Sequence, residues 1–600
     1  MTTETAPADR ITLPGGEMLT WSDLPEKHLP GGGPLATLAA RIVPTGARVL
    51  LAGPHDPAVL DRLAHADVTC LLRGYPDAVA LASHAARVVV GGPAGLPDGE
   101  LFDVVIAGAG LDAVESVEGA RLGWRGVLAR LSAALRPGGT LLLRVDNPMG
   151  LRRLVDTEPW YARRADDAWA VGGVLDADRP ANRAQLDDRL ADAGLLPGTT
   201  FAAYPDGGAA TALVDTDQLD RHTTSGLLDA VLHGACAGGF ADAAVLQDPA
   251  RLAVDALHAG QAAALAPSWL VLARRTPAGV AEPTGLPVAL VQTGPPGADV
   301  VEVVDEPPGW RWRVTETSGR DGAPTGRGVA YRDLGVLAGQ PVPTGRLLRT
   351  LLLDAALRRD LDTLRRLLTG YAEWLAGQAD GDGRLGGAVA LAGVDNTVVS
   401  PAGYAVLDAS WRATDPLAGD VVLARGLWRF AAELLTGGYA HPWPSTLDVA
   451  GLTVVLAGLA GQDLGRARVT AAVETEAAVT AALRGLDAEG RAALAAELVT
   501  VAPTDPPAGP RAYQQLHEAW QRQREELTRL TELQRWTDEL LTSRERALRR
   551  AEATMNLLSG SLTYRVGKLA VTPARLAKRG ARAAKRRARA ALSPKQEEQQ

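Results

Sequence analysis

Cysteine, lysine and long apolar runs are scarce in this chain of 600 residues. Cys70 and Cys236 are the only cysteines, too few for a disulfide framework or a thiolate zinc site, so a reducing compartment is expected. No basic stretch followed by an apolar run begins the chain, which predicts no signal peptide. The longest apolar run, Val449 to Gly461, is shorter than the about 20 residues that span a bilayer. We therefore expect a cytoplasmic protein.

Motifs of several common catalytic centres are missing as well. The nine histidines are scattered, with no HExxH and no paired cysteines, so the sequence predicts no metal site. No Gly-x-Ser-x-Gly sequence marks the turn that carries a hydrolase serine. These absences exclude the zinc and serine hydrolase classes that are most easily recognised from sequence.

The chain does contain enough apolar material for several cores. Apolar residues make up 46% of it, and 600 residues exceed the about 250–300 at which single cores stop growing. Its charge is uneven: after residue 552, eleven lysines and arginines stand against Glu597 and Glu598, although the net charge is −8. The body therefore carries −17, and its basic tail indicates an anionic partner, either a membrane surface or nucleic acid.

Changes of composition and periodicity divide the chain into six segments. They are a flexible N-terminus (1–33), an α/β domain (34–278), a linker or small irregular segment (279–340), a mainly helical domain (341–502), a coiled coil (511–558) and a basic tail (559–600). Prolines at 503, 506, 507 and 510 separate the helical domain from the coiled coil.

Apolar strands alternate with helices in the α/β domain. We expect strands at Arg48–Gly53, Val68–Leu72, Val88–Val90, Phe102–Ala107 and Thr140–Val145, followed by late strands at Phe201–Tyr204 and Ser268–Ala273. This alternation predicts a parallel sheet with helices on both faces.

The strand Phe102–Ile106 and the later Leu135–Leu143, with its Pro-Gly-Gly turn, resemble class I S-adenosylmethionine (SAM)-dependent methyltransferases. Four further stretches, in order, are similar to methyltransferases of bacterial cell-surface polysaccharide clusters: Val145–Leu151, Asn182–Leu195, Tyr204–Asp206 and Pro267–Val271. The resemblance covers roughly residues 35–275. It implies a Rossmann-like class I methyltransferase fold, SAM as the candidate cofactor, and methyl transfer to an oxygen of a sugar or glycan-linked acceptor.

The resemblance also implies where SAM would lie, at the carboxyl ends of the strands. The candidate cofactor-binding residues are Gly53, His55 and Asp56 after the first strand, Arg73 after the second, Gly92 after the third and Asn147 after the fifth. The sequence departs from the family here, since one glycine remains in the first turn and Arg73 replaces the ribose-binding carboxylate. No catalytic base can be named.

These departures leave a second interpretation open. Gly53 then only forms a turn, Asp56 only caps a helix and Asn147 only caps a turn. The protein would in that case be a catalytically inactive scaffold that keeps the methyltransferase fold for assembly.

The helical domain contains a further resemblance. Asp395-Asn396-Thr397 and the stretch Gly403–Trp411, which includes Asp408, resemble the catalytic-loop and metal-loop pair of kinase-like phosphotransferases, where Asn and Asp hold Mg²⁺. A Gly-rich phosphate loop, a strand lysine with its helix glutamate and a His-Arg-Asp motif are not recognisable. We expect a helical scaffold with a remnant hairpin; residual nucleotide binding or phosphotransfer at Asn396 and Asp408 is the alternative.

The C-terminal segments suggest partners. Alternating three- and four-residue steps from Tyr513 to Leu558 hold apolar residues at ten of fourteen positions, which predicts a coiled coil and a homo-oligomer. A helix packed against the body is the alternative. Ser561–Leu569 resembles the C-terminal stretch of polysaccharide-assembly proteins, and residues 559–590 suit an anionic membrane surface, here the inner face of the membrane. A solvated tail is the alternative, and nucleic acid is disfavoured because only Tyr564 offers a stacking ring.

Overall fold

The computed structural model describes residues 10–23, 32–82, 84–85, 87–157, 176–206, 208–241, 243–276, 285–292, 299–314, 328–444, 446–502, 511–560, 566–567 and 576–587. The chain divides into two compact units, Met1–Ala519 and Trp520–Gln600, which are considered separately. Among the helices in these ranges, none is both long enough and apolar enough to cross a membrane.

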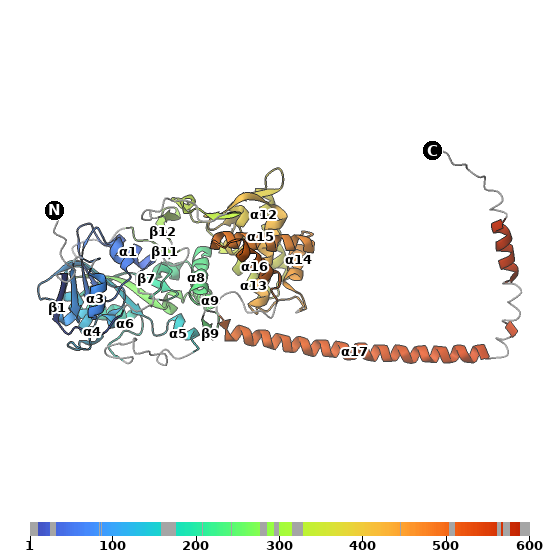
Figure 1. The fold of residues 1–600 in the computed structure, drawn as a ribbon, viewed down its shortest axis with the longest axis horizontal. Coiled ribbons are helices and arrows are strands. Elements are labelled where there is room, and N and C mark those ends of the chain that lie inside the picture. Colours follow the sequence, from blue (N-terminus) through green and yellow to red (C-terminus); the bar gives the residue numbers. More distant parts are fainter. Residues whose placement is uncertain are drawn as a thin grey trace. The chain divides into compact units, whose positions relative to one another are not determined.

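A large mixed sheet forms the core of the α/β half of the first unit (Figure 1). Its strands lie in the order β1-β4-β3-β2-β5-β6-β10-β7-β8-β11-β12-β13. They are β1 (Ile11–Gly15), β2 (Arg48–Ala52), β3 (Asp67–Leu72), β4 (Arg87–Gly91), β5 (Phe102–Ala107), β6 (Leu135–Asp146), β7 (Leu195–Tyr204), β8 (Ala212–Asp215), β10 (Ser268–Arg275), β11 (Ala289–Gln292), β12 (Val300–Glu306) and β13 (Gly309–Val314).

The strand order confirms the expected Rossmann-like α/β fold. Strands β1 to β6 pair in parallel, whereas β10 runs antiparallel between β6 and β7. The chain moves from β2 outward through β3 to β4, and then returns to the other side of β2 with β5. The carboxyl ends of β2 and β5 therefore form a topological switch point, where ligands bind in open α/β sheets.

Helices cover both faces of the parallel strands, as the apolar runs predicted. Consecutive residues of a strand point to opposite faces, so Leu50 and Val105 join one core while Leu51 and Val104 join the other. The helices around the large sheet include α1 (Pro34–Ile42), α2 (Pro57–Arg62), α3 (Tyr75–Leu81), α4 (Gly123–Ala133), α6 (Arg183–Asp192), α8 (Gly226–Gly239) and α9 (Pro249–His258).

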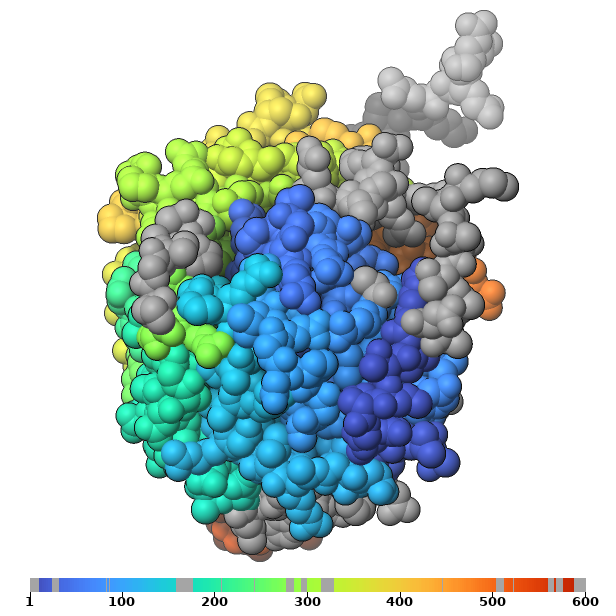
Figure 2. All heavy atoms as spheres, turned by 90° about the vertical axis from the view of Figure 1, so that its left-hand side faces the viewer, coloured from blue at the N-terminus to red at the C-terminus, as the bar shows by residue number. Residues whose placement is uncertain are grey.

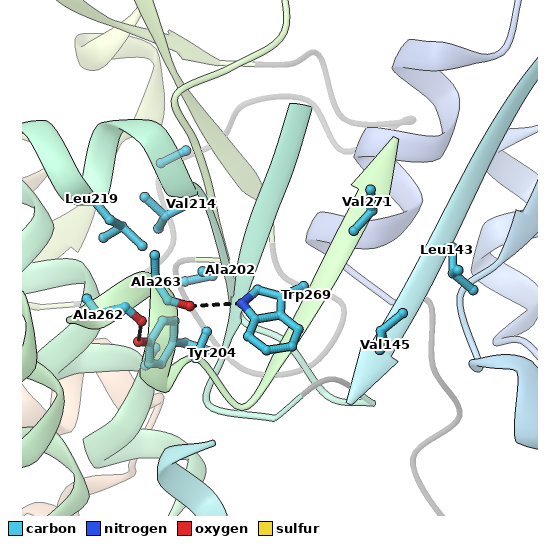
Figure 3. Packing of buried hydrophobic residues seen from close by; sticks show 14 of the residues in the cluster. Leu143, Val145, Ala202, Tyr204, Val214, Leu219, Ala262, Ala263, Trp269 and Val271 are labelled. Atoms are coloured by element: carbon cyan, nitrogen blue, oxygen red, sulfur yellow. Dashed lines mark hydrogen bonds between the residues drawn. The ribbon is translucent and has the colours of Figure 1, made fainter. Parts of the chain in front are cut away.

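Two buried aromatic side chains fix the late strands to the short helix α10 (Ala262–Leu265). Trp269 on β10 donates its indole N–H to the Ala263 carbonyl (2.8 Å), and the Tyr204 hydroxyl on β7 donates to the Ala262 carbonyl (2.6 Å) (Figure 3). Both rings are almost fully buried, and both of their polar atoms are hydrogen-bonded, as such burial requires.

Two of the predicted segments need correction. The flexible N-terminus predicted over 1–33 is wrong for residues 10–23, because β1 pairs in parallel with β4 at the edge of the sheet. The linker predicted over 279–340 instead supplies β11, β12 and β13, which extend the same sheet. In both places short strands lie between prolines and glycines. These turn-forming residues made the sequence pattern indicate loops where the structure has strands.

The mainly helical segment is built from α11 (Leu348–Leu357), α12 (Leu361–Gln378), α13 (Gly419–Thr436), α14 (Val449–Leu459), α15 (Arg466–Arg484) and α16 (Ala488–Val499). Figure 1 shows these helices grouped together, and most of them share a separate apolar core. Two small sheets accompany them, in the orders β14-β19-β16 and β15-β17-β18. Their strands are β14 (Ala330–Arg332), β15 (Arg346–Leu347), β16 (Arg384–Gly387), β17 (Thr397–Ser400), β18 (Gly403–Val406) and β19 (Trp411–Ala418).

The second unit consists mainly of one helix. Helix α17 (Tyr513–Gly560) begins in the first unit and continues through the second, and a further helical stretch covers residues 576–587. A continuous helix over the predicted coiled-coil segment agrees with the periodicity. Its association with a second copy stays a prediction, and half of the predicted membrane-binding stretch 559–590 lies outside the described residues.

Candidate functional site

Gly53 directly follows β2 at the switch point of the sheet. Its φ is +91°, a left-handed conformation that favours glycine. A Cβ atom at this position would lie 3.2 Å from the Ala109 Cβ and 3.6 Å from the Ala113 carbonyl oxygen. The turn therefore packs against the loop that follows β5, and protein atoms fill the space in front of the glycine.

His55 holds this turn in place. Its Nδ1 lies 2.9 Å from the Gly53 carbonyl oxygen, and its Nε2 accepts a hydrogen bond from the Gly108 N–H (3.1 Å). Burial, helped by the positive charge of Arg144, lowers the pKa of His55 to about 4, although the Gly53 carbonyl acts in the opposite direction. The neutral imidazole thus joins the loops after β2 and β5, and its ring nitrogens are both used within the protein.

Three other predicted site residues also have internal partners. Asp56 caps α2 by accepting from the Ala58 N–H (2.8 Å). Asn147 is buried and donates to the carbonyls of Ala264 (2.7 Å) and Ala266 (2.8 Å) while accepting from the Met149 N–H. Gly92 precedes a short 3₁₀ turn (Pro93–Gly95), and its carbonyl accepts from the Gly95 N–H (2.9 Å). Asp56 and Asn147 therefore have the capping roles that the sequence left open as alternatives.

Arg73 follows β3 at the predicted ribose position and is bound to the N-terminal residues. Its Nε donates to Asp23 Oδ2 (2.7 Å) and its Nη2 to Asp23 Oδ1 (2.5 Å), and the side chains are 4% and 9% exposed. The guanidinium also lies 5.7 Å from the ring centroid of Trp21. Asp23 is fixed in turn, because its N–H donates to Asp77 Oδ2 (2.8 Å).

Residues Gly15–Asp23, here named the closing segment, lie against the ends of β3 and β4. The Met18 N–H donates to the Arg73 carbonyl (2.9 Å), and the Tyr75 N–H donates to the Met18 carbonyl (3.1 Å). A Cβ at Gly74 would lie 2.5 Å from the Trp21 carbonyl oxygen, and one at Gly91 would lie 2.6 Å from that of Gly15. In Figure 2 the first described residues, in dark blue, lie directly on the α/β half.

A small pocket is left beside the closing segment. It measures about 210 Å³ and is lined by Arg73, Asp112, Trp124, Arg144, Asp146 and Arg179, among others. Burial raises the pKa of Asp112, although Arg179, 2.7 Å away, acts in the opposite direction. Pockets for small ligands measure about 300–1,000 Å³. In the described arrangement the closing segment therefore covers the ends of β3 and β4, next to Arg73 and Gly92, and the remaining pocket is smaller than ordinary small-ligand sites.

A much larger cavity of about 1230 Å³ lies elsewhere in the first unit, between α8, strands β11 to β13 and the helical segment. It is here named the large cavity. Asp395, Asn396 and Asp408 of the kinase-like remnant line it, together with Arg332. Asp56, one of the predicted SAM-site residues, also lines the large cavity.

The remnant residues stabilise their own hairpin. The Asn396 amide donates to the Asp408 carbonyl (2.9 Å) and accepts from the Asp408 N–H (2.8 Å). The Asp408 carboxylate accepts from the Ser410 N–H (2.9 Å) and lies 3.4 Å from Arg332 Nη2. Both side chains therefore bind protein groups at the open end of the β17–β18 hairpin, where β17 begins and β18 ends.

Sequence reasoning missed the other charged residues of the large cavity. Arg425 and Arg429 lie one turn apart on α13, and Glu476 lies on α15. The missed signal was a pair of arginines four residues apart within the apolar stretch Val421–Leu435, since charged residues on a buried helix face need partners.

The chain was compared with known proteins. Neither a protein-family model nor a curated protein sequence matches it. Among solved structures it is similar to the 1,6-didemethyltoxoflavin-N1-methyltransferase of Burkholderia thailandensis, with S-adenosylhomocysteine bound (17% identity, 29% of this chain and 72% of that one, TM-score 0.20). It is similar to the SAM-bound amino pentose methyltransferase CalS10 of Micromonospora echinaspora (21% identity, 29% and 85%, TM-score 0.18). It is also similar to the cyclopropane synthase MmaA2 of Mycobacterium tuberculosis (17% identity, 40% and 82%, TM-score 0.21). Likeness of this extent identifies no substrate or reaction.

Proposed function

We propose that this chain is a methyltransferase-fold protein that works without SAM, as a scaffold in the assembly of cell-surface polysaccharide. The observation that carries this proposal is the closing segment, which occupies the ends of β3 and β4 and is anchored by the Arg73–Asp23 pair. The predicted cofactor edge is thereby used for contacts within the protein.

The chemistry of Arg73 supports the same proposal. A ribose hydroxyl that donates a hydrogen bond needs an acceptor, and a guanidinium has only donors. Freeing Arg73 from Asp23 would also remove the carboxylate that pairs with a buried guanidinium, and breaking such a pair costs about 3–5 kcal/mol. The free energy of SAM binding would have to offset that cost.

Features of the sequence suggest which partners such a scaffold would have. The motifs similar to polysaccharide-cluster methyltransferases suggest a sugar or glycan-linked partner. The apolar seam of residues 511–558 suggests a homo-oligomer, and the basic residues of 559–590 suggest attachment to the anionic inner face of the membrane. Several tails on one oligomer would hold the membrane more firmly than one, since linked sites raise the effective concentration.

A second candidate function is methyl transfer from SAM to an oxygen of a sugar or glycan-linked acceptor. It is favoured by the strand order β4-β3-β2-β5-β6-β10-β7 and by the large cavity, which reaches Asp56 beside the Gly53 turn. This function requires the closing segment to withdraw. The protein would then act mainly by holding the two reactants in line.

Calorimetric titration of SAM and S-adenosylhomocysteine into the full chain and its Asp23→Ala variant separates the two candidates. The scaffold proposal expects no binding to either protein at millimolar ligand. Binding to Asp23→Ala alone would favour a SAM enzyme whose closing segment withdraws, and binding to the unaltered chain would exclude the scaffold proposal. The control is Asp98→Ala, which removes an exposed partner of Arg130 in the same unit.

A further inference from the structure

We propose that the large cavity binds an amphipathic ligand, with an uncharged, hydroxyl-rich head at its charged end and an apolar chain along α8. The inference goes beyond the scaffold function and does not depend on whether SAM binds. Its support comes from the residues that line the cavity on each side.

One wall of the cavity is apolar and open. Helix α8 contributes Leu227, Val231 and Ala235, and Val301 and Leu337 continue the wall. Gly234 and Gly238 lie one turn apart on the same helix and are exposed; a Cβ at either position would have nothing within 4 Å. An extended apolar chain can therefore lie close to the backbone of α8 without displacing any side chain.

The other end of the cavity carries paired charges. Arg425 Nε lies 2.5 Å from Glu476 Oε2, Arg429 Nη2 lies 2.8 Å from Asp395 Oδ2, and Arg332 Nη2 lies 3.4 Å from Asp408 Oδ2. Burial acts to raise the pKa values of Asp395 and Glu476, but Arg425 and Arg429 outweigh it and hold both below their usual range. Both carboxylates are thus ionised at neutral pH.

This pairing favours a hydroxyl-rich head over an anionic one. Each of the three arginines already faces a carboxylate, so the end of the cavity has no surplus positive charge for a phosphate. A sugar hydroxyl can donate to a carboxylate and accept from a guanidinium at the same time. Arg429 and Asp395 are within reach of such a head, since their side chains are 36% and 40% exposed.

The size of the cavity fits a ligand with both parts. Its volume of about 1230 Å³ exceeds the about 300–1,000 Å³ of ordinary small-molecule sites. Trp312 and Trp411 also line it, and an indole ring can pack against the apolar face of a sugar ring. A small polar metabolite would leave the α8 wall uncovered, and a plain hydrocarbon would leave the charged end unused.

The test uses the full chain and four probes: n-octyl β-glucoside, glucose, octanol and octyl phosphate, each below its micelle concentration. We expect octyl glucoside to bind about tenfold more tightly than any of the others, because it alone has both an apolar chain and an uncharged head. Gly234→Leu fills the open wall and should weaken octyl glucoside binding about tenfold. Gly458→Leu is the matched control, since Gly458 is an exposed glycine of α14 that also has open space around its Cβ position.

The variant Gly238→Leu serves as a second test if Gly234→Leu fails to fold, which circular dichroism reports. Failure of octyl glucoside to bind would overturn the proposal. It would also be overturned if Gly234→Leu and Gly238→Leu bound octyl glucoside as tightly as the unaltered chain does. Preference for octyl phosphate would overturn the assignment of an uncharged head. Because none of these measurements involves SAM, their failure is distinct from failure of the scaffold proposal.

Discussion

Arg73 and Asp23 form a buried two-point ion pair that joins the end of β3 to the N-terminal residues. Fifty residues separate them in the sequence, and the predicted ribose position lies where they meet. The pair therefore links two properties of this chain: an arginine at the predicted ribose position and the use of that space by the closing segment.

Removing Asp23 should destabilise the α/β half. Asp23→Ala leaves the buried Arg73 guanidinium without its carboxylate, which costs about 3 kcal/mol. Urea denaturation followed by tryptophan fluorescence measures this free energy. Asp98→Ala, which removes an exposed partner of Arg130, should cost less than about 1 kcal/mol. Equal effects of the two substitutions would contradict the importance of the Arg73–Asp23 pair.

Stability should fall in mild acid because of His55. Its pKa is about 4 in the folded chain, against an ordinary value of 6.5, so the unfolded chain binds the proton more tightly. The stabilisation is fully present above pH 6.5 and is lost as the pH falls towards 4, by about 3 kcal/mol in all.

His55→Gln should flatten the dependence of the unfolding free energy on pH within this window. If the full pH dependence persists in His55→Gln, groups other than His55 cause it.

Gly53 should resist substitution for structural reasons alone. Gly53→Ala places a Cβ in a left-handed conformation and 3.2 Å from the Ala109 Cβ, and we expect a loss of about 1–3 kcal/mol. Differential scanning calorimetry of the full chain should show a lower Tm for its α/β half. An unchanged Tm would mean that this turn adapts, and that Gly53 is needed for something other than close packing.

The seam of α17 should drive self-association. In the single chain Leu527, Leu530 and Leu541 are 65%, 42% and 54% exposed, as expected of a coiled-coil seam without its partner. Sedimentation equilibrium should give a mass that is a multiple of 62.6 kDa. Leu530→Asp with Leu541→Asp should give the single-chain mass, whereas Thr531→Asp with Ser543→Asp, outside the seam, should not. A single-chain mass for the unaltered protein would leave α17 as an isolated helix.

The sheet could be predicted from the sequence because its strands are continuous apolar runs. Leu50 and Leu51 face different cores, and a strand buried on both sides needs no alternation to be recognised. Strand β1 was missed because it is short and its residues Thr12 to Gly15 are exposed at the edge of the sheet. Local pattern carries little information at such an edge.

The candidate sites were less predictable because they depend on contacts between distant residues. Asp56 and Asn147 were identified together with their capping alternatives, since capping is local. The closing segment was not identified, because nothing near Asp23 in the sequence reveals that Arg73 lies beside it. The Arg425–Glu476 pair was missed for the same reason, as its members lie 51 residues apart on two helices.

Hydrogen–deuterium exchange of residues 11–23 in the full chain tests the central claim most directly. The claim is that the closing segment occupies the predicted cofactor edge, with the Met18 N–H bonded to Arg73 and β1 paired with β4. The account predicts slow exchange in this segment, unchanged by millimolar SAM. Fast exchange in the absence of SAM, or exchange that rises when SAM is added, would contradict it.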